Sequence, residues 1–305
     1  MGLGGPTIMY RAGAALLALG AVASIPAVAA KCGPAMVQVT VLDQGGTALS
    51  GLAPSDFKVR IKNQGVTVAA VDYGVFPHST LLLISRTSSM GQSLKIELAR
   101  RLAQSVVAGA PGNVMGGSYG SDVSGIADAR AGQAFGTLQA GTDNRNVIYD
   151  AVIAGMSTMN LHRGDAVVVI TDSQDNGSKT TSNELVQRFA TTGARLFIIA
   201  LPPASEGGTM QSLTQLAEST GGATLVPLHV DDTTKGIVIS PAQVEGAVTT
   251  LTRSFTQYNN IYQLETDAEG QDKALPLRVE IDRRKLGAGK VVAPTVLAPC
   301  TSVGQ

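Results

Sequence analysis

Three purely apolar runs constrain the fold of this chain more than any other feature. TLLLIS (80–85), DAVVVITD (165–172) and RLFIIALP (195–202) lack polar alternation, as is typical of strands buried on both faces. Segments with helical spacing lie between and after these runs, at 93–109, 147–159, 182–193, 210–222 and 241–257. This alternation predicts an α/β fold with a doubly wound, mainly parallel sheet and helices on both faces. We expect Ser182 to cap the third helix.

A second pattern lies at the two ends of the chain. Segments 36–43, 57–63 and 66–75 alternate apolar and polar residues, and we expect them to form hairpins with a turn at Gln64-Gly65. Segments 260–267 and 275–283 alternate in the same way, so they are candidates to pair with the first set. The predicted organisation is therefore a β subdomain at 31–77, an α/β domain at 78–260, and strands at 261–305 that join the β subdomain.

The first 30 residues have the features of a signal peptide. Arg11 precedes the apolar run 12–23, and the small residues of SIPAVAA suit cleavage before Ala30 or before Lys31. An uncleaved anchor is the alternative, while a lipoprotein at Cys32 is disfavoured by Lys31 in front of it. No later segment is long and apolar enough to cross a membrane. We therefore expect an exported protein, periplasmic or secreted, without a membrane span after cleavage.

The chain has two cysteines, Cys32 and Cys300, at opposite ends of the mature protein. In an oxidising compartment they can form a lasting disulfide. Such a bond would close nearly the whole fold, and chain entropy assigns it on the order of 4–5 kcal/mol. The alternative is two unrelated thiols. If the terminal strands pair, the cysteines come together, so the two predictions support each other.

Charge and composition exclude some classes of partner. Lysine and arginine number 23, as do aspartate and glutamate, so no basic excess favours nucleic acid or an anionic membrane surface. Hydrophobic residues make up 44% and charged residues 15%, which suits a packed globular core.

Polar residues follow two of the apolar strands at the point where each ends. LLLISRTSSMG (81–91) runs from a buried strand into hydroxyls, and TDSQDNGS (171–178) adds carboxylates. Ligands of open α/β sheets bind outside the carboxyl ends of the parallel strands. Hydroxyl and carboxylate oxygens are ligands of Mg²⁺, Mn²⁺ or Ca²⁺.

These loops also carry a family resemblance. LLLISRTSSMG, IYDAV (148–152) and VVVITDSQDNGS (167–178), in this order and spacing, resemble a von Willebrand factor type A domain. The flanking stretches over 36–75, ESTGGATLVPL (218–228) and LPLRVEI (275–281) resemble the exported bacterial subgroup called VWFA-related. The resemblance covers roughly residues 36 to 285, and it implies the type A fold.

The family's metal-ion-dependent adhesion site has a D-x-S-x-S loop, a threonine from a second loop and an aspartate after a later strand. Carried over by position, these ligands are Ser85, Thr87, Ser89, Asn146 and Asp172. The family's first aspartate is thus Ser85 here, and the second-loop threonine is Asn146. Only Asp172 keeps a carboxylate.

The loss of a carboxylate weakens the case for a metal. A divalent cation would lack one unit of compensating charge, and Arg86 adds a positive charge nearby. We therefore expect a degenerate site without cofactor, held by hydrogen bonds among its polar side chains, with an Arg86–Asp172 pair as a variant. Occupancy by Mg²⁺ or another divalent cation is the alternative.

An enzyme is not expected, because no catalytic motif is evident. The three histidines, His78, His162 and His229, lie in no recognisable catalytic pattern, and no nucleophile elbow or phosphate-binding loop occurs.

The resemblance implies binding to a protein partner at the metal face. With the metal site degenerate, we expect a metal-independent adhesion or scaffold module whose contact rim includes Arg86, Met90 and the loop 110–145. The alternatives are Mg²⁺-dependent binding through a weakened site, and a structural envelope component that docks partners through its β subdomain.

Overall fold

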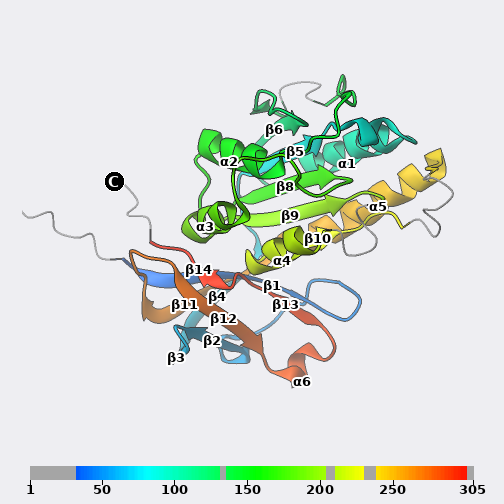
Figure 1. Cartoon of the computed structure of the whole chain (residues 1–305). Helices are drawn as coiled ribbons and strands as arrows, with labels where there is room; N and C mark the ends of the chain where they lie inside the picture. The colour runs from blue at the N-terminus through cyan, green and yellow to red at the C-terminus, as the bar shows by residue number, and fades with distance from the viewer. Residues whose placement is uncertain (1–31, 131–134, 204–209, 230–237, 301–305) are drawn as a thin grey trace, which may run out of the picture. The chain divides into compact units, whose positions relative to one another are not determined.

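A six-stranded sheet forms the centre of the α/β part of the molecule (Figure 1). The computed structural model describes residues 32–130, 135–203, 210–229 and 238–300, so the predicted signal peptide lies outside the described residues. The strands run in the order β10 (Ala223–Leu225), β9 (Arg195–Ala200), β8 (Ala166–Thr171), β5 (Thr80–Ser85), β6 (Val114–Tyr119) and β7 (Ala127–Asp128). All neighbours pair in parallel except β6 and β7, as the apolar runs predicted.

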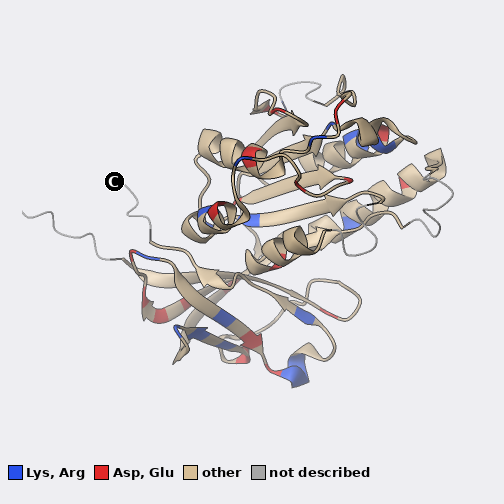
Figure 2. Cartoon of the chain, in the orientation of Figure 1, with Lys and Arg blue, Asp and Glu red and all other residues tan. Residues whose placement is uncertain are grey.

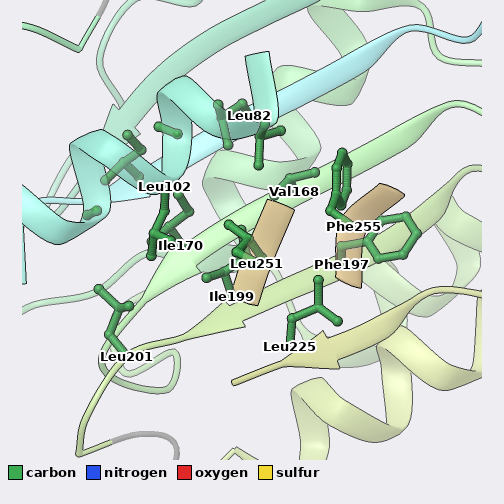
Figure 3. Close-up of a cluster of buried hydrophobic side chains, with 14 of the residues drawn as sticks. Leu82, Leu102, Val168, Ile170, Phe197, Ile199, Leu201, Leu225, Leu251 and Phe255 are labelled. Carbon is green, nitrogen blue, oxygen red and sulfur yellow. The ribbon is translucent and has the colours of Figure 1, made fainter. Parts of the chain in front are cut away.

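Helices cover both faces of this sheet, and the alternation of side chains in β5 shows why. Leu82 and Ile84 face a cluster formed with α1 (Lys95–Gly109) and α5 (Pro241–Tyr258). Leu81 and Leu83 face the opposite cluster, to which α2 (Ile148–Met159), α3 (Ser182–Thr192) and α4 (Gln211–Ser219) contribute. Figure 3 shows the first cluster, in which aliphatic side chains of the strands pack against Phe255 and Leu251 of α5.

Strands from both ends of the chain form the β subdomain. One sheet has the order β13 (Lys290–Val292), β1 (Pro34–Leu42), β11 (Asn260–Glu269), β4 (Val68–Val75). The other has the order β14 (Val296–Leu297), β12 (Leu275–Ile281), β2 (Phe57–Ile61), β3 (Gln64–Val66). Their inward residues, such as Val37, Val59 and Leu277, share one buried cluster. The predicted pairing of N-terminal with C-terminal strands is confirmed.

The predicted disulfide is also confirmed. Cys32 and Cys300 are bonded, with their Cα atoms 5.9 Å apart and a sequence separation of 268. The pairing of β1 with β11 brings the two ends of the chain together.

Three local predictions were wrong. Only β2 and β3 form a local hairpin, because β1 and β4 both pair with β11 instead. The hairpin turn lies at Lys62 and Asn63, whose φ values are +50° and +66°, and not at Gln64-Gly65. Asn tolerates positive φ better than most residues, so this turn fits its sequence. Thr181, not Ser182, caps α3, because its side chain and that of Glu184 form a reciprocal capping box.

The remaining elements are short: the 3-10 turns η1 (Pro54–Asp56) and η2 (Ser88–Gly91), and α6 (Arg283–Leu286). Figure 2 shows that charged residues lie mainly on helices, loops and the β subdomain, while the central strands are almost free of them. Among the helices of the described residues, none has the length and apolar character to cross a membrane.

The burial of His78 makes stability depend on pH. Burial, followed by the nearby Arg195 guanidinium, lowers the pKa of His78 to about 4 from 6.5. Because the unfolded chain takes up the proton first, stability is fully present above pH 6.5 and is lost as the pH falls towards 4. We expect the wild type to lose roughly 3 kcal/mol from this group, and His78→Phe to lack that loss. Urea unfolding at pH 7 and pH 4.5 measures the difference. His162→Phe at an exposed site is the control, and an equal loss in both variants would contradict the assignment.

Candidate functional site

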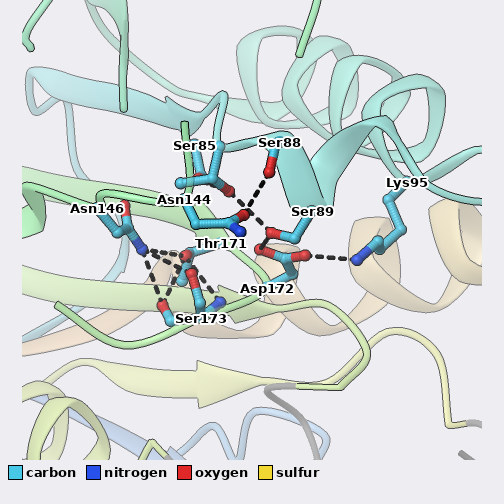
Figure 4. A network of polar contacts seen from close by, with 10 residues as sticks. Ser85, Ser88, Ser89, Lys95, Asn144, Asn146, Thr171, Asp172 and Ser173 are labelled. Carbon is cyan, nitrogen blue, oxygen red and sulfur yellow. Dashed lines mark hydrogen bonds and ion pairs between the residues drawn. The ribbon is translucent and has the colours of Figure 1, made fainter. Parts of the chain in front are cut away.

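The carboxyl ends of β5 and β8 place the predicted polar residues side by side. The two strands are parallel neighbours, with Ile84 opposite Ile170, so Ser85 and Thr171 end at the same edge of the sheet. Their loops therefore meet there, and α2 adds the segment around Asn146. Ser85, Thr87, Asn146 and Asp172 are each at most 2% exposed, so this is a buried polar cluster (Figure 4).

A chain of hydroxyls connects the first loop to Asp172. The Ser85 and Thr87 hydroxyl oxygens lie 3.3 Å apart, and those of Thr87 and Ser89 lie 3.0 Å apart. Ser89 Oγ then donates to Asp172 Oδ1 at 3.0 Å. Four of the five predicted residues are thus linked by hydrogen bonds.

Lys95 provides the cation of the cluster, and the sequence analysis missed it. Its Nζ donates to Asp172 Oδ2 at 2.5 Å, and the two side chains are only 1% and 0% exposed. Figure 4 shows the ammonium reaching the carboxylate from the start of α1. The retained carboxylate therefore has an ammonium on one oxygen and a hydroxyl on the other.

The local backbone explains why Lys95 points inward. Ser93 and Leu94 both have positive φ, +50° and +58°, directly before the helix, which begins at Lys95. Lys95 lies three residues before Leu98 and four before Ala99, on the buried face of α1. This spacing could have predicted the burial of Lys95 from the sequence. A lysine at the start of an apolar helix face lies on the buried side of the helix. A cation at a helix N-terminus is opposed by the helix dipole, so the pairing with Asp172 compensates for both burial and position.

Asn146 lies beside the cluster but does not contact Asp172. Its Nδ2 donates to Ser173 Oγ at 2.8 Å, with longer contacts to Thr171 and to backbone oxygens of the β8 loop. Asn176 Oδ1 accepts the backbone N–H of Asn146 at 2.7 Å. Asn146 therefore holds the β8 loop against α2, while its own Oδ1 is buried without a partner among the described residues.

Two predictions about the cation and the rim need correction. Arg86 does not pair with Asp172; its guanidinium forms an ion pair with the exposed Asp122 on the surface. The backbone of Arg86 is fixed by hydrogen bonds to Tyr119 and Gly141, which accounts for the outward direction. Met90 is not a rim residue, because it is fully buried in the cluster between the sheet and α1.

Tyr119 is a second residue that sequence reasoning missed. It ends β6 opposite Ser85 and is fully buried. Burial raises the pKa of Tyr119 far above its ordinary value, and the neighbouring Thr171 hydroxyl offsets this only in part. The phenol of Tyr119 thus stays neutral, and its hydroxyl lies beside the polar cluster.

The residues present do not fit a divalent cation. Such an ion prefers several oxygen ligands with compensating negative charge. Here Asp172 is the one carboxylate among the predicted ligands, and the Lys95 ammonium already neutralises it. Adding a divalent cation would leave two uncompensated positive charges in a buried cluster. No group of three or more His, Cys, Asp or Glu side chains in the described residues is placed to hold a metal.

The histidines lie apart from this cluster. His78 is buried, and its Nδ1 lies 3.1 Å from the backbone oxygen of Phe76. His162 and His229 are exposed. Asp175, in the β8 loop, accepts hydrogen bonds from Tyr149 N and Ser178 Oγ, which tie the loop to the start of α2.

The buried ion pair should show as strong coupling between its two partners. Lys95→Met leaves Asp172 buried without its cation, and Asp172→Leu leaves the ammonium alone. Each is expected to lower the free energy of unfolding by about 3–5 kcal/mol. The double variant should recover most of that loss, because no unpaired charge remains. Urea unfolding followed by far-UV circular dichroism measures the cycle. Strictly additive single losses would show that the two groups are not coupled.

Several solved structures are similar to the chain, with low sequence identity. No protein-family model and no curated protein matches the chain. Among solved structures, a von Willebrand factor type A protein from Catenulispora acidiphila matches with 12% identity and a TM-score of 0.42, over 90% of this chain and 76% of that one. The ArnB paralog VWA2 from Sulfolobus acidocaldarius matches with 11% identity and a TM-score of 0.40, over 89% and 76%.

The proximal thread matrix protein 1 of the mussel byssus matches with 11% identity and a TM-score of 0.47, over 66% of this chain. The chain spans only 51% of that protein's length. These are likenesses of fold alone. The chain has an α/β fold with helices on both faces of a mainly parallel six-stranded sheet, and a β subdomain built from its two ends.

Proposed function

We propose that this chain is an exported, non-enzymatic protein-binding module of adhesion or scaffold type that works without a metal. The observation that carries the proposal is the buried contact of Lys95 Nζ with Asp172 at 2.5 Å, among the hydroxyls that correspond to the family's metal ligands. The ammonium takes the structural place of a cation there. It is inaccessible to a partner, so recognition has to use the surrounding loops.

The loops around the cluster offer such a surface. Arg86 and Asp122 pair across it, and Ser88 donates to Asn144 from a neighbouring loop. From here on, the name rim refers to these four side chains, without the buried Met90. Backbone hydrogen bonds add support, including Ser88 N to Asp143 O at 2.9 Å. Loops held on a rigid scaffold in this way are where recognition usually occurs.

Export is supported by the disulfide between Cys32 and Cys300, since such bonds persist in oxidising compartments. The signal-peptide features of residues 1–30 agree with this. The periplasm and the extracellular space both suit the proposal.

A second candidate is cation-dependent binding through the weakened site. The unpartnered, buried Oδ1 of Asn146 favours it, because this atom is one free oxygen ligand beside the cluster. A structural envelope component is a third candidate, in which the β subdomain makes the contacts.

Metal dependence can be tested by restoring the site. The wild type is expected to show no saturable rise in melting temperature with millimolar Mg²⁺, Mn²⁺ or Ca²⁺, because only a bound ligand stabilises. Ser85→Asp combined with Lys95→Gln restores a second carboxylate and removes the competing ammonium, so it should gain metal binding by calorimetry. Ser85→Asp with Arg86→Gln is the matched control. It retains Lys95 and should remain without metal. A saturable shift in the wild type would favour the cation-dependent candidate.

The rim can be tested by charge reversal. We expect Arg86→Glu to reduce the yield of photo-crosslinks to envelope proteins of the source cell at least tenfold. The substitution removes a cation of the rim and leaves the buried core unchanged. Arg60→Glu, on the exposed face of β2, should leave the crosslinks unchanged. Crosslinks lost with Arg60→Glu and retained with Arg86→Glu would instead favour the structural role of the β subdomain. Matched circular dichroism spectra control for folding.

A further inference from the structure

A buried and a half-buried arginine lie where the α/β part meets the β subdomain. Arg195, the first residue of β9, is 3% exposed, and Arg163 precedes β8. Arg195 Nη1 donates to Tyr258 O at 3.1 Å. Arg163 donates to Met36 O, Ala298 O and Pro299 O at 2.8–3.2 Å. Arg163 thus joins the α/β part to the β subdomain, while Arg195 contacts the end of α5, and both arginines bond to neutral backbone oxygens.

Neither arginine forms an ion pair within 4.0 Å among the described residues. The carboxylate of Asp165 raises the pKa of Arg195. Both of its oxygens already accept hydrogen bonds from backbone N–H groups, those of Ser79 and His162. Glu265 lies opposite Met36 on β11 but pairs with neither arginine. Arg195 has Asp165 nearby, and no described carboxylate accompanies Arg163, so one positive charge is left without compensation in this partly desolvated region.

Several polar atoms without hydrogen-bond partners belong to residues that line one cavity. Arg195 Nε and Nη2, Arg163 Nε and Gln38 Oε1 are buried without hydrogen-bond partners among the described residues. Both arginines and Gln38 line a partly open cavity with a volume of about 20 Å³, together with Thr220 and apolar residues such as Leu277 and Val296. A space of this size holds one small molecule or ion. The Gln38 amide can also turn its NH₂ group towards an anion.

We propose that this cavity is a binding site for one small monovalent anion of chloride size. One such ion would neutralise the excess charge, accept the unused N–H donors and fit the available volume. It would bridge β1 of the subdomain with β9 and the loop before β8.

The protonation of the surrounding groups agrees with the proposal. Burial lowers the pKa of Arg195 to about 10, which Asp165 offsets only in part, and burial alone lowers the pKa of Arg163. His78, near Arg195, stays neutral at pH 7, since burial lowers its pKa to about 4. An anion in the cavity would relieve the burial of both arginines.

Thermal unfolding of the full protein at constant ionic strength tests the proposal, with sodium chloride or bromide exchanged for sodium gluconate. Constant ionic strength keeps general screening equal. We expect a saturable rise in melting temperature of about 2–4 °C with either halide, because only the folded state contains the site. Gluconate is too large for the cavity and should give no rise. Equal melting temperatures in all three salts would overturn the proposal.

A built-in carboxylate provides the second test. Gln38→Glu places a negative charge on the cavity wall, so it should raise the melting temperature in gluconate and abolish the halide effect. Gln104→Glu, which adds the same charge on the exposed surface of α1, should retain the halide effect. Crystals of the wild type grown in bromide should give an anomalous peak between Arg163 and Arg195. A water molecule without anomalous signal there would refute the site, whether or not the variant folds.

Discussion

The burial of the central sheet on both faces is the constraint on which the rest of the structure depends. β5 and β8 consist of residues that are fully buried along their whole length. The buried polar side chains of these strands therefore lie at the strand ends, where the chain leaves the apolar core. The carboxyl ends carry the hydroxyl cluster around Asp172. At the amino ends, Arg163 before β8 contacts the β subdomain, and Arg195 at the start of β9 contacts the end of α5.

A buried charge at either end needs a counter-charge, and the two ends meet that need differently. At the carboxyl ends the counter-charge to Asp172 is Lys95 at the start of α1. The positive φ values of Ser93 and Leu94 fix its position. Backbone strain of this kind is retained only where the surroundings over-determine it, and here the ion pair and the packing of α1 do so. At the amino ends the counter-charge within the described residues is incomplete, because Asp165 lies near Arg195 and no described carboxylate accompanies Arg163.

Long-range organisation could be predicted from the sequence because it follows from periodicity. Continuous apolar runs identified the parallel strands β5, β8 and β9, and alternation at both ends identified the strands that bring Cys32 to Cys300. The direction of individual side chains could not be predicted in the same way. Arg86 looked like the natural partner of Asp172, but its backbone is held by Tyr119 and Gly141 and directs it outward. Met90 looked like a loop residue, yet a short 3-10 turn folds it into the core. The role of Lys95 depends on where α1 begins, and helix boundaries are the least predictable part of a sequence pattern.

The position of the disulfide has a consequence for how the protein can be displayed. Cys32 and Cys300 join the two ends of the described chain within the β subdomain, which contacts the loop before β8 through Arg163. The rim lies at the carboxyl ends of the same parallel strands. Anything joined to either end, whether a tether, a surface or a second module, therefore leaves from one point, and the strands act as a spacer that keeps the rim directed away from it. Tension applied between the two ends would pass through the covalent bond and leave the loops of the rim unloaded.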